Sequence, residues 1–120
     1  MSYDPNNIFA KILRGEIPCD KVYEDDHVLA FNDIEPQAPN HVLVIPKGAY
    51  CSFDDFSAKA SAEEIASYIR AIGKIGRDLG LSSCGYRILS NIGQDANQEV
   101  PHLHVHLVGG KRLGRMLSSA

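Results

Sequence analysis

The clearest periodic pattern in the chain is a long amphipathic stretch in its second half. Apolar side chains recur there at the three- and four-residue spacing of one helix face, at Ile65, Tyr68, Ile69, Ile72, Ile75 and Leu79. Ser61 precedes the stretch, Glu64 stands three positions later as in a capping box, and Gly80 follows the last apolar residue. The pattern predicts a long helix between Ser61 and Gly80 with one buried face.

A shorter helix and five strands are predicted in the rest of the chain. Asn6 or Asn7 can cap a helix over residues 8–14, which Gly15 would end. Short apolar runs that are typical of strands occupy 21–24, 28–32, 42–45, 86–90 and 100–108. The run 42–45 is apolar at every position, as in a central strand. This order favours an α+β fold in which an antiparallel sheet of about five strands carries helices on one side.

Composition is that of a single globular domain. The chain has 120 residues, 44% hydrophobic and 22% charged, with a formal net charge of -3, and we expect residues 1–120 to form one domain. No run of like charges suggests a nucleic-acid partner, and no apolar run approaches the roughly 18 residues of a membrane span. The first residues lack the apolar core of a signal peptide, and three cysteines fit no disulfide framework. We therefore expect a cytoplasmic protein with reduced thiols.

Candidate chemistry is concentrated in three alternate histidines, His102, His104 and His106. On a regular strand the period of two would place all three on one face, about 6.6–6.8 Å apart. The other face would be apolar and would pack against a helix, with Leu103, Val105, Leu107 and Val108. Burying three imidazoles without partners is costly, so this pattern favours a functional site.

Two kinds of site are compatible with these histidines. Two histidines on a strand can bind zinc together with a third ligand, which here predicts a site of His102, His104 and His41. Imidazole is also a nucleophile that titrates near neutral pH, which favours phosphoryl or acyl transfer. No Cys-x-x-Cys, His-Glu-x-x-His or Walker motif offers a competing site.

The segment 102–108 resembles the histidine triad (HIT) family, because it fits the pattern His-φ-His-φ-His-φ-φ in which φ is apolar. Further blocks are similar to the Hint branch, the purine nucleoside phosphoramidases: 8–12, 16–18, 31–34, 36–41, 45–47, 85–87, 91, 98–100, 109–110 and 113–114. The resemblance implies hydrolysis of adenosine 5′-phosphoramidate or aminoacyl-linked AMP through a nucleotidyl-histidine. A dinucleoside polyphosphate hydrolase, a zinc-binding protein and a nucleotide-binding interaction protein are the alternatives.

The resemblance assigns a role to each histidine. His104 aligns with the nucleophile that attacks the α-phosphorus, and His102 and His106 align with the imidazoles that contact phosphate oxygens and manage the leaving-group proton. His41 aligns with a fourth, supporting histidine. The family likeness also implies a homodimer with a continuous ten-stranded sheet, in which residues 109–120 form a C-terminal tail that approaches the partner's active site.

A purine nucleotide pocket is implied as well. Asp33 aligns with the carboxylate that accepts hydrogen bonds from the ribose hydroxyls. The walls of the purine slot align with four apolar residues, for which plain core packing is an equal alternative: Phe9, Ile12, Phe31 and Ile34. The predicted substrate contacts also include the polar residues Asn32, Asn91, Asn97, Gln98 and Glu99.

The sequence departs from the family pattern in three places that matter for chemistry. Ala96 and Asn97 occupy positions commonly held by glycine, which predicts a different loop path near the phosphate. Glu99 takes a position that is serine in some members. Asn7 and Ala10 stand where zinc-binding members carry Cys-x-x-Cys, so we expect neither a metal nor another cofactor.

Overall fold

Residues 2–117 are described by a computed structural model, which contains one five-stranded sheet and three helices. In chain order the elements are α1 (Ile8–Leu13), β1 (Lys21–Glu24), β2 (Val28–Asn32), β3 (Asn40–Pro46), α2 (Phe53–Lys59), α3 (Ala62–Asp78), β4 (Tyr86–Leu89) and β5 (Val105–Gly109). The strands are ordered β1-β2-β3-β5-β4, and all neighbours are antiparallel. The predicted α+β fold and the central place of residues 42–45 are confirmed.

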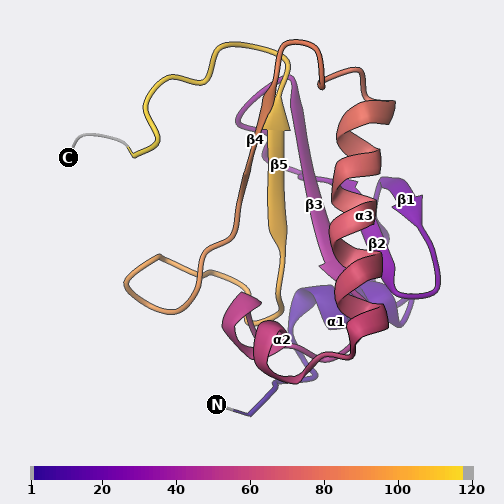
Figure 1. The fold of residues 1–120 in the computed structure, drawn as a ribbon. Coiled ribbons are helices and arrows are strands. Elements are labelled where there is room, and N and C mark those ends of the chain that lie inside the picture. The colour runs from indigo at the N-terminus through magenta and orange to yellow at the C-terminus, as the bar shows by residue number, and fades with distance from the viewer. Residues whose placement is uncertain (1, 118–120) are drawn as a thin grey trace.

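Helices cover both faces of the sheet. Val42 and Val44 of β3 pack in one core with α3, whereas Leu43 and Ile45 pack in another with Phe9 of α1. Figure 1 shows α3 on the near side of the sheet and α1 farther from the viewer. The prediction that the helices lie on one side is therefore wrong. Because β2 and β3 are apolar at successive positions, each face of the sheet needs an apolar cover.

The long helix α3 begins and packs as its pattern predicts, with one exception. Ser61 and Glu64 form the capping box, and each side chain accepts the other residue's backbone N–H. The Tyr68 hydroxyl is buried and donates to the Val44 carbonyl at 2.7 Å, which ties α3 to β3. Ile69 is 54% exposed, so its predicted place on the buried stripe is wrong. It lies about 100° around the helix from Tyr68, which points it away from the sheet.

A third helix, α2, was not predicted. Ser52 caps it by accepting the Asp55 N–H, and Phe56 is its one buried residue. With seven residues and a single buried anchor, the segment has too little apolar repetition to be recognised by periodicity. The prediction of two helices is therefore wrong, because the structure contains α2 as a third helix.

The last strand is shorter than predicted. β5 starts at Val105, and residues 100–104 have no strand partner. Backbone hydrogen bonds fix this segment instead, from His102 N–H to Val100 O at 2.9 Å and from Leu103 N–H to Tyr50 O at 2.8 Å. The prediction of a regular strand over 100–108 is therefore wrong for His102 and His104. The intervening apolar side chains still face the α3 core, as predicted: Leu103, Val105 and Leu107.

The beginning of the chain is held against the fold. Asn7 caps α1 by accepting the Ala10 N–H at 2.9 Å, and Gly15 follows with a φ of 79°, both as predicted. No disulfide joins the three cysteines, all of which lie within residues 2–117. None of the helices in that range is both long enough and apolar enough to cross a membrane.

Candidate active site

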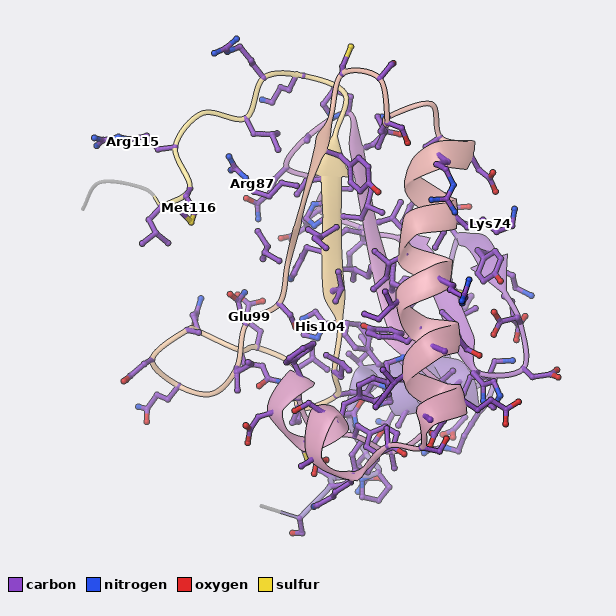
Figure 2. All side chains as sticks on the ribbon, in the orientation of Figure 1. Lys74, Arg87, Glu99, His104, Arg115 and Met116 are labelled. Atoms are coloured by element: carbon purple, nitrogen blue, oxygen red, sulfur yellow. The ribbon has the colours of Figure 1, made fainter. Side chains whose placement is uncertain are left out.

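The candidate site is a cavity of about 560 Å³ between α1 and the face of the sheet that α1 covers. One wall comes from α1 and the segment that follows it, and another from the end of β2. His104 and His106 form the floor together with Leu43. The loop before β5, represented by Asn97, Glu99 and Val100, closes the remaining side. Figure 2 shows Glu99 near His104 at the lower end of β5, and both residues line the cavity.

Most of the predicted site residues meet in this cavity. They are His104, His106, Phe9, Ile12, Phe31, Asn32, Asp33, Ile34, Asn91, Asn97 and Glu99. The predicted residues His41, His102 and Gln98 do not line it. Sequence analysis missed the lining residues Ile8, Ile17, Pro18, Cys19, Asp20, Glu35, Gln37, Leu43 and Val100. Several of these residues are immediate sequence neighbours of predicted site residues. That adjacency is the signal by which they could have been identified.

His104 presents a bare nitrogen. Its Nδ1 atom lies 2.8 Å from the His102 carbonyl oxygen. Because a carbonyl can only accept a hydrogen bond, Nδ1 carries the proton, and the neutral ring has an unprotonated Nε2. The ring of Phe9 packs edge-on against it, with centroids 5.0 Å apart. His104 therefore has the tautomer that a nucleophile requires.

His106 has the opposite tautomer, because His41 fixes it. The backbone N–H of Gln37 donates to Nδ1 of His41 at 3.1 Å, so neutral His41 carries its proton on Nε2. That Nε2 lies 2.9 Å from Nδ1 of His106 and donates to it. Neutral His106 consequently bears its own proton on Nε2. The cavity floor thus holds one imidazole that can attack and a neighbouring imidazole that can donate, with ring centroids 5.1 Å apart.

His102 lies beneath the cavity and is fully buried. Its Nε2 donates to the Pro46 carbonyl at 2.9 Å, and its Nδ1 is 2.6 Å from the Tyr3 hydroxyl. Both ring nitrogens are thus used inside the protein. The structure places His102 as a support for His104 and not among the residues that line the cavity.

Burial keeps these imidazoles neutral. Desolvation lowers the pKa of His102 and of His106 to about 4, and the neighbouring His104 adds to both shifts. Desolvation also lowers the pKa of His104, although the hydrogen bond to the His102 backbone opposes the shift, as do Asp33 and Glu99 to a smaller extent. An imidazole with a lowered pKa keeps its lone pair at pH 7. The bare Nε2 of His104 is therefore available at neutral pH.

Asp33 uses one oxygen for the backbone. Its Oδ1 accepts the Glu35 N–H at 2.9 Å, which closes a tight turn after β2. Its Oδ2 lies 3.4 Å from Nε2 of His41, beside the histidine pair. The Asp33 carboxylate thus stabilises the turn after β2 and also lines the cavity.

A metal site is poorly supported by the donors present. Ligand atoms of Asp33, His41 and His106 lie within 4.8 Å of one another. Binding a metal through Nε2 of neutral His41 would require a proton on Nδ1, where the Gln37 N–H already donates. The other zinc set, His102, His104 and His41, does not fit because both nitrogens of His102 are engaged. Hydrogen bonding accounts for these side chains better than metal coordination does.

The loop before β5 is ordered by its own side chains. Asn97 has a φ of 58°, and it is the non-glycine residue with positive φ among residues 2–117. Asparagine tolerates this left-handed conformation better than most non-glycine residues do. The Gln98 amide accepts the Gly93 N–H and donates to the Cys51 and Val100 carbonyls. Gln98 therefore holds the loop and does not reach the cavity.

The lining carries carboxylates and no cations. Among the described residues that form the cavity there is no Lys or Arg, and the acidic members are Asp20, Asp33, Glu35 and Glu99. An anionic ligand would therefore rely on imidazole and other neutral donors. Each additional negative charge on such a ligand would be repelled by the wall.

The C-terminal tail keeps away from this cavity. Arg87 of β4 donates to the Gly114 carbonyl at 2.8 Å and also to the Arg115 carbonyl. Figure 2 shows Arg115 and Met116 well apart from His104. None of the described tail residues lines the cavity of its own chain, and residues 118–120 of the predicted tail lie outside the described residues.

Comparisons with known proteins agree with this geometry. The sequence profile of the HIT domain matches residues 14–113. A 13.2 kDa HIT-like protein of Azospirillum brasilense is 64% identical over 98% of this chain and 96% of its own. The purine nucleoside phosphoramidase of Escherichia coli K12 is 45% identical over 92% of each chain. A histidine triad protein from Clostridium difficile superposes with a TM-score of 0.84 at 45% identity, over 97% of this chain and 100% of its own. The chain belongs to the HIT family of hydrolases.

Proposed function

We propose that the protein hydrolyses purine nucleoside phosphoramidates through a nucleotidyl intermediate on His104. The observation that carries the proposal is the pair of opposite tautomers on the cavity floor. His104 offers a bare Nε2 and His106 offers an Nε2–H. Attack on phosphorus requires a lone pair, and charge on the phosphoryl oxygens and the leaving group requires a nearby donor.

The reaction follows from these two groups. Nε2 of His104 forms a bond to the α-phosphorus while the P–N bond breaks, and the electron pair of that bond stays on the departing nitrogen. Solvent supplies the proton with which that nitrogen leaves as the amine, while neutral His106 keeps its own proton and donates an Nε2–H hydrogen bond to the reacting group. Water then attacks phosphorus and breaks the bond to His104, and the proton that the water loses passes to solvent. The products are the nucleoside monophosphate, the amine and the unchanged enzyme.

The charge of the wall favours a phosphoramidate over a dinucleoside polyphosphate. A nucleoside phosphoramidate carries about one negative charge, whereas a polyphosphate bridge carries several. With carboxylates and no Lys or Arg among the described lining residues, the extra charges would have no cationic partner. The 45% identity to the phosphoramidase of Escherichia coli K12 supports the same choice.

The rest of the cavity suits a purine nucleoside. Phe9 and Phe31 lie edge-to-face with centroids 5.6 Å apart, and both line the cavity with Ile12 and Ile34. Ile34 is 92% exposed, so it is not a core residue and is free to cover one side of a base. Asp33, the residue before Ile34 in the chain, would then accept hydrogen bonds from the ribose hydroxyls. This arrangement favours base contact over core packing for Ile34.

We also propose a homodimer in which the β4 edge extends the sheet to ten strands. The β1 edge carries the ion pair between Lys21 and Glu24, a feature that discourages strand pairing. The β4 edge instead exposes Ile88 at 54% and Leu89 at 38%. Light scattering should give about twice the 13.1 kDa chain mass, and an Ile88→Lys variant should shift the mass toward one chain. A wild-type monomer at micromolar concentration would contradict this proposal.

A comparison of two substrate classes tests the function. The purified protein would be incubated with an adenosine phosphoramidate whose amine becomes fluorescent on release, and separately with diadenosine polyphosphates. We expect kcat/KM to be clearly larger for the phosphoramidate, and His104→Gly to abolish turnover of both. Equal rates, or faster cleavage of the polyphosphates, would place the protein with a different class of HIT hydrolase.

A further inference from the structure

We propose that Tyr3 is a positioning residue of the active site, which holds His102 in place and through it orients His104. Tyr3 stands before α1, outside the residues 14–113 that match the HIT domain profile. It does not line the cavity, so it would not touch substrate. The kinetic part of this inference rests on the proposed function.

The contact is directional. Since Nε2 of His102 donates to the Pro46 carbonyl, Nδ1 is the unprotonated nitrogen of the neutral ring. The Tyr3 hydroxyl, 2.6 Å away, is therefore the donor in this hydrogen bond. The two rings also meet edge-to-face, with centroids 5.5 Å apart. Both nitrogens of a fully buried imidazole are thus satisfied, one by β3 and one by the N-terminal segment.

His102 needs such an anchor because its main chain belongs to no strand. The segment 100–104 precedes β5 and has no ladder partners, so a few separate contacts define its path. The carbonyl of His102 accepts Nδ1–H of His104 at 2.8 Å, the bond that leaves Nε2 of His104 bare. A displaced His102 ring would move this carbonyl. The position of Tyr3 is thereby linked to the geometry of His104.

The N-terminal segment is fixed well enough to serve as an anchor. The side-chain amide of Asn7 donates to the Asp4 carbonyl at 2.7 Å, and the Asn6 N–H donates to an Asp4 carboxylate oxygen at 2.9 Å. Arg14, just after α1, donates to the Pro5 carbonyl at 2.8 Å. These contacts tie residues 4–7 to α1, which itself forms a wall of the cavity. Tyr3 therefore directly precedes a segment whose position is fixed by hydrogen bonds.

The test compares Tyr3→Phe with Tyr23→Phe. Tyr23 is a matched control because its half-buried hydroxyl also makes a 2.6 Å hydrogen bond, to Asp25, and the residue does not line the cavity. Steady-state kinetics would give kcat and KM for the fluorogenic phosphoramidate. NMR would give the solvent exchange rate of the His104 Nδ1–H proton and the ¹⁵N chemical shift of His102 Nδ1. Each variant loses one hydroxyl and keeps its ring, so both are expected to fold.

For Tyr3→Phe we expect kcat to fall by about three- to tenfold, the worth of one hydrogen bond, with KM changed less than twofold. His102 Nδ1 should shift and the His104 proton should exchange faster, while Tyr23→Phe changes neither. An unchanged kcat, an effect on KM alone, or an unaltered His104 proton in Tyr3→Phe would each overturn the proposal. If the wild type did not hydrolyse phosphoramidates, the proposed function would fail, and the NMR comparison would still decide whether Tyr3 positions His104.

Discussion

Nε2 of His41 lies 2.9 Å from Nδ1 of His106, and this hydrogen bond determines which nitrogen of His106 faces the cavity as a donor. The direction of the bond follows from the Gln37 N–H, which donates to the other nitrogen of His41. A backbone amide outside the histidine segment therefore sets the protonation pattern of the site. His41 does not line the cavity itself, so an effect of His41 on a bound ligand would have to be exerted through His106.

Replacing His41 should separate this positioning role from simple packing. In His41→Leu, His106 loses the donor that fixes its tautomer, and we expect kcat/KM for a phosphoramidate to fall on the order of tenfold to a hundredfold. In His41→Gln, the side-chain amide can still donate to His106 and accept from Gln37, so much of the activity should remain. Steady-state kinetics of both variants check this. Similar losses in the two variants would argue against the hydrogen bond as the cause.

The nucleophile can be tested by trapping its adduct. His104→Gly removes the bare Nε2, and we expect kcat to fall on the order of a thousandfold or more, since the remaining contacts supply only positioning and charge stabilisation. Rapid quench followed by intact mass measurement should detect a nucleotidyl adduct on the wild type and none on the variant. Binding of AMP should be nearly unchanged. An adduct of equal yield on His104→Gly would exclude this residue as the nucleophile.

The chemistry of the site was predictable from sequence wherever it depended on local spacing. The alternation of His104, Val105 and His106 was sufficient to place two imidazoles on one side and an apolar residue on the other. The capping box at the start of α3 involves residues three positions apart and was equally readable. In these cases the interacting groups are neighbours in the chain, so the pattern and the structure report the same geometry.

The surroundings of His102 depend on contacts that no local pattern records. One of its partners, Tyr3, is 99 positions away in the chain, and the other, the Pro46 carbonyl, is 56 positions away. Alternation alone placed His102 on the same strand face as His104. The backbone turn at 100–104 and these distant partners remove it from the cavity. The helix layer on the second face of the sheet was missed for a similar reason. Which helix covers which face depends on contacts between residues that are far apart in the chain.

Acidification should destabilise the fold before the carboxylates titrate. Burial lowers the pKa of His102 and of His106 to about 4, whereas histidine in an unfolded chain titrates near 6.5. Between these values the unfolded state binds more protons, so the free energy of unfolding falls as pH falls, by at most ~1.4 kcal/mol per pH unit for each histidine. Above pH 6.5 this contribution is fully present and does not change with pH.

Urea unfolding at pH 7.5, 6.5, 5.5 and 5 measures this dependence. His102→Gln provides the control, because glutamine can donate to the Pro46 carbonyl and accept from Tyr3 but does not titrate. The variant should show a shallower decline than the wild type below pH 6.5. A wild-type free energy of unfolding that stayed level from pH 7.5 to 5 would mean that neither histidine is held neutral by the fold.

The carboxylate of Asp33 allows recognition of ribose to be separated from support of the turn. Its Oδ1 accepts the Glu35 N–H at 2.9 Å, so a simple truncation to alanine would disturb the turn as well as the ligand contact. Asp33→Asn keeps an oxygen for Glu35 and replaces the charged acceptor with an amide. Hydrogen bonds to a charged group are worth about 1.5–3 kcal/mol, so we expect AMP to bind about ten- to a hundredfold more weakly to the variant.

The decisive measurement compares AMP with its 2′,3′-dideoxy analogue on both proteins. If Asp33 accepts the ribose hydroxyls, the wild type should prefer AMP strongly, and Asp33→Asn should bind both nucleotides with similar, weak affinity. Because the asparagine retains the turn, its Tm should stay near that of the wild type, whereas Asp33→Ala should lose both the preference and thermal stability. An Asp33→Asn protein that kept the wild-type preference for intact ribose would assign sugar recognition to another side chain of the cavity. Asn32 would then be the next residue to test, since it lines the same wall and its amide donates to Asp20 at 2.8 Å.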